Sequence, residues 1–137
     1  MAALKNALKD KHKDNIRLQH IVASAVPAAL AAIDGRTVLV IAQDEDEAGY
    51  MYHDLCQLIG EDKTLFFPSS YKRAVKYGQR DAANEILRTE VLSRIAATDN
   101  NSKKSLFVVS HPAALAEMVV SHDRLQQSTI TLRTGQE

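Results

Sequence analysis

Four basic residues and two tyrosines gather in one polar stretch of the chain, YKRAVKYGQR, at residues 71–80, which contains no acidic residue. Cationic side chains can contact phosphates, and aromatic rings can stack on bases. Lys72, Arg73, Lys76 and Arg80 are therefore the candidate contacts to a nucleic acid or to a protein partner. The alternative is a basic loop that is simply solvated, which is the more common case.

A second place where chemistry could occur is the turn that holds phosphates in nucleotide-binding α/β folds. Such a turn needs glycines, whose N–H groups close around the phosphates, and a lysine that neutralises them. The stretch in the corresponding position, residues 20–28, contains no glycine, lysine or arginine. Val22 and Val26 would crowd the approach, and Pro27 removes an N–H donor from the start of the following helix. The residues favour a packed turn over a phosphate site.

The acidic run after TVLVIA, residues 43–47 (QDEDE), resembles the carboxylates that hold magnesium in nucleotide hydrolases. Two arguments favour a structural role instead. Without a phosphate loop no nucleotide brings the metal, and carboxylates at a helix start are stabilised by the helix dipole. The sequence therefore predicts no metal site here.

Several side chains could in principle supply a nucleophile and a base, but no G-x-S-x-G elbow exposes a serine. Ser110 and His111 are instead predicted to cap a helix that begins at Pro112. Cys56 shares a helix face with Tyr52 and is predicted to be a small core residue rather than a reactive thiol. The candidate nucleophiles and bases are Ser24, Ser110, His20, His53 and His111.

The composition is that of an ordinary globular domain. Of the 137 residues, 45% are hydrophobic and 25% are charged, and 17 basic residues balance 17 acidic ones, so no overall field attracts the chain to nucleic acid or to an anionic membrane. No apolar run approaches eighteen residues, and the N-terminus lacks the apolar centre of a secretory signal. One cysteine can form no internal disulfide. We expect a single cytoplasmic domain that does not contact a membrane.

Apolar strands alternate with helices along the chain, which predicts a parallel sheet with helices on both faces. Residues 16–22 fit either a buried strand or the end of a helix, and 129–133 alternate as a half-buried edge strand does. Residues 1–15 are predicted to hold a loosely docked N-terminal helix. The predicted strands span residues 37–42, 64–67 and 106–109, with the first covered on both faces, and the predicted helices span 27–33, 44–59, 80–96 and 112–120.

The segment order itself is recognisable. TVLVIAQDEDEAGYMYHDL, LFFPSSY, a helix ending VLSRIA, SLFVVSHPAALAEMVV and TITLRTGQ together resemble the N-terminal region of Mfd, the family of bacterial transcription-repair coupling factors, across residues 16–136. That region is similar to the first domain of the repair helicase UvrB. The resemblance implies a helicase-like, RecA-like fold with a degenerate phosphate loop. The stretch at 65–84 stands where UvrB carries its DNA-gripping hairpin and is too short to hold one.

The resemblance also implies a function. Members of the family are ATP-dependent DNA translocases that release stalled RNA polymerase from double-stranded DNA and recruit nucleotide excision repair through UvrA. ATP and magnesium act in a separate motor, so residues 16–137 would form a non-catalytic UvrB-like domain without a cofactor, whose partner is the rest of the parent chain. The ending after a predicted strand suggests a piece of a longer protein. Two alternatives remain, a doubly wound enzyme acting on a small molecule near Ala42, Pro68 and Ser110, and a DNA-contacting module using residues 71–80.

Overall fold

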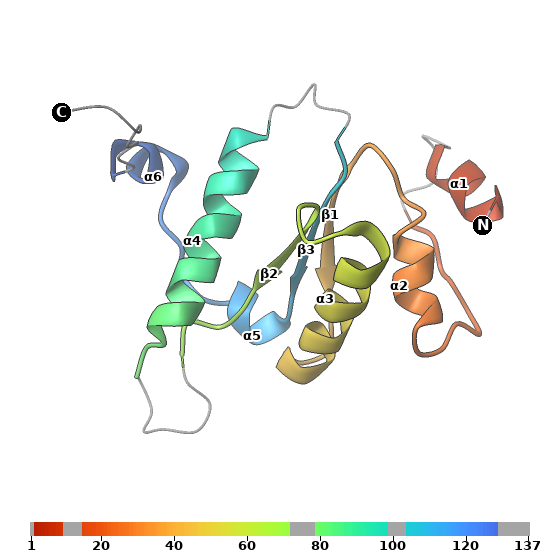
Figure 1. Cartoon of the computed structure of the whole chain (residues 1–137), viewed down its shortest axis with the longest axis horizontal. Coiled ribbons are helices and arrows are strands. Elements are labelled where there is room, and N and C mark those ends of the chain that lie inside the picture. The colour runs from red at the N-terminus through yellow and green to blue at the C-terminus, as the bar shows by residue number, and fades with distance from the viewer. Residues whose placement is uncertain (1, 10–14, 72–78, 99–103, 129–137) are drawn as a thin grey trace.

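A parallel three-stranded sheet forms the centre of the molecule (Figure 1). The computed structural model describes residues 2–9, 15–71, 79–98 and 104–128. The strands β1 (Thr37–Ile41), β2 (Thr64–Phe67) and β3 (Leu106–Ser110) lie in the order β1-β3-β2. Both pairings are parallel. The α/β class and the parallel sheet predicted from the sequence are therefore confirmed.

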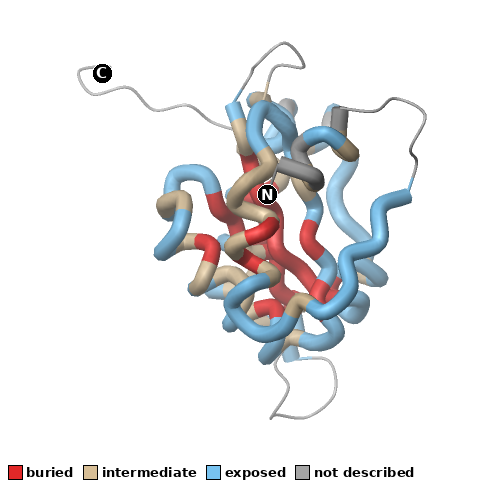
Figure 2. Tube along the Cα trace, turned by 90° about the vertical axis from the view of Figure 1, so that its right-hand side faces the viewer, coloured by how far each residue is buried: buried red, intermediate tan, exposed pale blue. Residues whose placement is uncertain are grey.

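Strand β3 is buried along its whole length because its side chains face two different helices. Phe107 and Val109 belong to the apolar cluster under α3 (Glu45–Ile59), which supplies Leu55. Leu106 and Val108 belong to a second cluster, which includes Val91 of α4 (Ala82–Ala97). Successive residues of a strand point to opposite faces, so α3 and α4 cover opposite faces of the sheet. Figure 2 shows the buried segments at the centre, enclosed by exposed ones.

The prediction that the first strand is covered on both faces was wrong. In β1, Leu39 is 52% exposed and Ile41 57% exposed, whereas Val40 is buried. The sequence order of the strands does not reveal their spatial order, and β1 lies at the edge of the sheet. Among the described residues, α4 covers β2 and β3 but leaves this face of β1 open.

The two long helices begin at the predicted places because aspartates cap them. Asp44 accepts a hydrogen bond from the N–H of Glu47, and the carboxylate of Glu47 accepts one from the N–H of Gln43. Asp81 likewise accepts from the N–H of Ala83 at the start of α4. Each cap satisfies a helix N–H that has no partner within the helix, which stabilises it by about 1 kcal/mol. Gly60, at φ +95°, ends α3.

The apolar residues of α4 recur at four-residue steps, at Ala83, Leu87, Val91 and Ile95, but only part of this stripe is buried. Val91 is buried, but Leu87 and Ile95 are more than one third exposed. The other buried side chain of this helix is Arg88, which is 6% exposed. Glu90 and Arg94, one helical turn apart, form an ion pair with 3.9 Å between its charged atoms.

The chain after β3 departs from the single helix predicted for residues 112–120. Helix α5 (Pro112–Leu115) ends after one turn, residues 118–121 continue without helix, and α6 (His122–Ser128) follows. The predicted caps also differ, because the His111 side chain makes no capping bond and the hydroxyl of Ser110 donates to the carbonyl of Phe67 at 2.8 Å. This bond ties the ends of β2 and β3 together.

The N-terminal part contains two short helices. Helix α1 (Ala2–Lys9) is joined to the domain by Arg36, whose guanidinium donates to the carbonyl of Leu8 at 2.7 Å. Residues 16–22, for which a strand and a helix end were both open, form neither. Helix α2 (Ala25–Leu30) packs on α3. No helix in the described ranges is long and apolar enough to cross a membrane.

The expected strand at residues 129–133 lies outside the described residues, as does the end of the first predicted helix at 10–14.

Candidate functional site at the carboxyl ends of the strands

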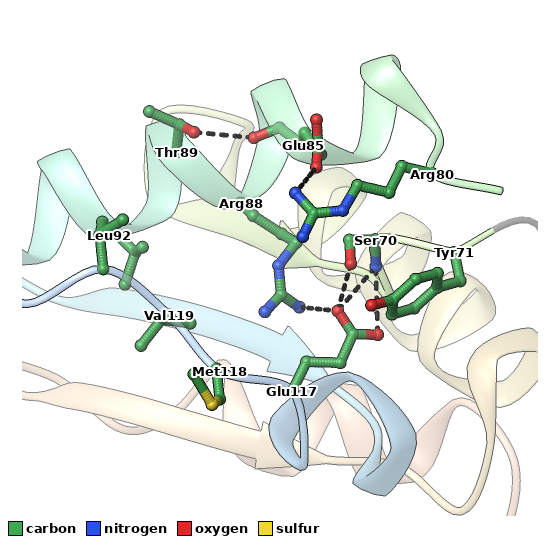
Figure 3. Close-up of a pocket in the computed structure, with 11 residues that line it drawn as sticks. Ser70, Tyr71, Arg80, Glu85, Arg88, Thr89, Leu92, Glu117, Met118 and Val119 are labelled. Atoms are coloured by element: carbon green, nitrogen blue, oxygen red, sulfur yellow. Dashed lines mark hydrogen bonds and ion pairs between the residues drawn. The ribbon is translucent and has the colours of Figure 1, made fainter. Parts of the chain in front are cut away.

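A cleft of about 460 Å³ opens where β2 ends, between α4 and the chain that links α5 to α6. In parallel α/β sheets, ligands bind at this end of the strands. We call this space the α4 cleft. It is lined by Ser70, Tyr71, Arg80, Glu85, Arg88, Thr89, Leu92 and residues 117–120, most of which Figure 3 shows in close-up.

A buried ion pair forms one wall of the α4 cleft. The guanidinium of Arg88 lies 3.4 Å from a carboxylate oxygen of Glu117, and both side chains are largely shielded from solvent. The same guanidinium nitrogen donates to the carbonyls of Pro68 and Ala114. The guanidinium also lies over the ring of Phe67, 4.1 Å from its centroid. Arg88 therefore joins the ends of β2 and α5 to α4.

Glu117 fixes the start of the loop that follows β2. Its carboxylate accepts hydrogen bonds from the hydroxyls of Ser69 and Ser70, each at 2.5 Å, and from the N–H of Ser70. Burial opposes ionisation, but these donors and the charge of Arg88 outweigh it and lower the pKa of Glu117. The side chain is thus an ionised acceptor at neutral pH.

The stem of the basic stretch lies at the mouth of the cleft. Tyr71 and Arg80 form an antiparallel bridge, so the two ends of the loop meet. Arg80, one of the four predicted contacts, forms a 2.9 Å ion pair with Glu85, which raises the pKa of its guanidinium. Lys72, Arg73 and Lys76 lie outside the described residues.

Two residues of the turn at 20–28 have a backbone conformation that is rare for residues other than glycine. His20 and Ala23 have φ values of +60° and +49°, in the left-handed region that favours glycine. Ser24 makes no side-chain cap to α2, and Pro27 is buried in this six-residue helix. The turn is therefore closed by backbone bonds, from the N–H of Ala25 to Val22 and of Val26 to Ala23.

The acidic run after β1 lies at the N-terminus of α3, where its carboxylates interact favourably with the helix dipole. Asp44 is the cap, and Glu45, Asp46 and Glu47 occupy the first turn. Within the residues that the structure describes, no three His, Cys, Asp or Glu side chains are grouped so as to hold a metal ion.

Among the described residues, no hydrogen bond joins any two of the candidate nucleophiles and bases. His111 is 3% exposed, and its Nε2 has no hydrogen-bond partner among the described atoms. Cys56 is half-buried beside Tyr52, so the prediction of a small side chain near the core is partly met. Burial, followed by a hydrogen bond with Cys56, raises the pKa of Tyr52 to about 12.

Sequence reasoning missed the central residues of the cleft, which are Arg88, Glu117, Ser69 and Ser70. A weak signal was present, because the two serines follow directly after an apolar strand, where polar groups converge in such folds. Nothing in the local pattern singles out Arg88 or Glu117, which lie 29 positions apart by their numbers. Their pairing arises only from the packing of α4 against α5.

Comparison with protein families, with curated proteins and with solved structures finds no significant match to this chain.

Proposed function

We propose that this chain is a non-catalytic UvrB-like domain from the N-terminal region of a transcription-repair coupling factor. In this role it supports a neighbouring partner-binding domain and handles no nucleotide. The parent protein would use ATP in a separate motor to displace stalled RNA polymerase from DNA and to recruit excision repair.

The observation that carries the proposal is the composition of the turn before α2. Residues 20–28 contain neither a glycine nor a basic residue, and Pro27 has no N–H to offer. The positive φ values of His20 and Ala23 support it, because Cβ atoms stand at positions where a phosphate loop would use glycine. The segment order of the resembling family adds the biological context.

Calorimetric titration of the chain with magnesium and ATP tests the proposal. We expect no heat of binding. Affinity in the micromolar range would contradict it and would favour the doubly wound enzyme. Sequence of the gene beyond codon 137 tests the family assignment separately, because it should encode a motor with an intact phosphate loop.

A DNA-contacting module is the second candidate, favoured by the Tyr71–Arg80 bridge that closes the stem of the basic loop. Binding through phosphates would weaken steeply as the salt concentration rises. Replacing Lys72, Arg73, Lys76 and Arg80 with alanine should then abolish binding to a fluorescent DNA duplex. The engagement of Arg80 with Glu85 argues against this candidate, since that cation is already partnered.

A further inference from the structure

The chain that links α5 to α6 presents an exposed apolar segment to solvent. Met118 is 97% exposed, and Val119 and Val120 are each about half exposed. The segment is neither helix nor strand. No hydrogen bond joins its backbone N–H or C=O groups to another described residue. Backbone groups that have no partner among the described residues, next to apolar side chains, are open to hydrogen bonding with an added peptide.

The opposite wall of the α4 cleft supplies an apolar contact and unused donors. Leu92, from α4, lines the cleft across from Val119. The two hydrogen bonds of Arg88 and its ion pair with Glu117 all use one terminal nitrogen, Nη1. Nε and the other terminal nitrogen make none to a described residue. Figure 3 shows the Arg88 guanidinium between Glu117 on one side and Leu92 and Val119 on the other.

The charges of the cleft select against a charged ligand. Arg88 is paired with Glu117, and Arg80 is paired with Glu85. An added anion would compete with Glu117 for a partly buried guanidinium, and an added cation would face Arg88 at close range. A neutral acceptor, such as a peptide carbonyl, can instead satisfy the unused donors without changing the charge balance.

We propose that the α4 cleft binds an uncharged, apolar peptide segment in extended conformation. The peptide pairs its backbone with that of Met118–Val120, rests an apolar side chain between Leu92 and Val119, and directs a carbonyl at Arg88. The volume of about 460 Å³ falls within the range of 300–1,000 Å³ typical of ligand pockets. This inference does not depend on the function proposed above.

The capped tripeptide acetyl-Val-Leu-Val-amide is a suitable probe, added to the ¹⁵N-labelled full chain and followed by NMR. We expect saturable shifts of the amide resonances of Met118, Val119 and Val120. Two matched probes test the chemistry. Acetyl-Glu-Leu-Glu-amide should bind at least about tenfold more weakly, because its carboxylates meet paired charges. A version with N-methylated backbone amides should lose binding, because the peptide then has no backbone N–H groups to donate to residues 118–120.

Matched variants locate the site. Val119→Asp places a carboxylate on the apolar wall and should weaken binding at least about tenfold. Leu58→Asp is the control, because Leu58 of α3 is also 52% exposed but lies outside the α4 cleft. It should leave the affinity unchanged. Equal losses in the two variants, or equal binding of the N-methylated probe, would overturn the proposal.

Two other occupants are distinguishable. If a second copy fills the cleft, the amides of residues 118–120 will shift with protein concentration in the absence of peptide. If the chain's own residues 129–137 fill it, truncation after Ser128 will shift the same amides and the intact chain will not respond to the probe. Either result would overturn the proposal.

Discussion

The turn at residues 20–28 and the α4 cleft contrast in how they use polar groups. The turn carries no cation, and its order rests on backbone bonds and on Pro27 packed in α2. The α4 cleft encloses a buried ion pair, Arg88 with Glu117, whose side chains are hydrogen-bonded to Pro68, Ser69, Ser70 and Ala114. The polar groups that the fold has buried and satisfied thus lie at the ends of β2 and β3, not at the position where a nucleotide would be expected.

Because of that difference, we expect substitutions in the two regions to change the stability of the chain by different amounts. A buried charge depends on each of its partners, since loss of one partner leaves the other uncompensated. An exposed turn without charges has no such dependence. Substitutions at the α4 cleft should therefore affect stability far more than substitutions at the turn.

Removal of Arg88 should have the largest effect. Arg88→Met leaves the shielded carboxylate of Glu117 without its cation, and we expect the free energy of unfolding to fall by about 3 kcal/mol. Urea denaturation followed by circular dichroism measures the change. The control is Arg94→Met on the same helix, because the Arg94 guanidinium is partly exposed, pairs with Glu90 and donates to the carbonyl of Asp62. We expect this variant to lose only about 1 kcal/mol, because solvent screens both interactions. Similar losses in both variants would show that burial gives the Arg88–Glu117 pair no special importance for stability.

The pH dependence of stability should report on Glu117. Its pKa in the folded chain lies below the ordinary value of 4.5, so its contribution is present above that value and is lost as the pH falls through the folded pKa. Glu117→Gln should therefore flatten the decline in the urea midpoint below about pH 4.5. If the urea midpoint of this variant falls below pH 4.5 as steeply as that of the unmodified chain, other carboxyl groups control the decline.

Loss of the α3 cap should have an intermediate effect. Asp44→Ala removes the acceptor of the Glu47 N–H, and we expect a loss of about 1 kcal/mol, measured by thermal unfolding. Asp44→Ser should recover most of it, because serine caps nearly as well. A loss of metal affinity rather than of stability would instead favour the magnesium interpretation of the acidic run.

The smallest effect is expected in the turn, and its sign is opposite. Ala23 has a φ of +49°, which glycine adopts without the steric strain of a Cβ atom. Ala23→Gly should therefore stabilise the chain by roughly 0.5 kcal/mol after the greater entropy of unfolded glycine is subtracted. Ala25→Gly, inside α2, is the control and should destabilise it by about 0.5–1 kcal/mol.

Sequence patterns predicted the strands and long helices because those signals are local. Continuous apolar runs marked β2 and β3, and the carboxylates after TVLVIA marked the start of α3. Features that depend on spatial neighbours were missed. The open face of β1 follows from the strand order, and the end of α5 follows from the bonds that draw Glu117 toward Ser69 and Ser70. The burial of Arg88 likewise requires Phe67 and Ala114, which are distant in sequence.

Titration of the ¹⁵N-labelled chain with magnesium and ATP, followed residue by residue, tests the central claim most directly. The account predicts that the amides of residues 20–28 keep their chemical shifts up to millimolar nucleotide. Saturable shifts at Val22–Ala28 would place a nucleotide at the turn and contradict the proposal of a non-catalytic domain.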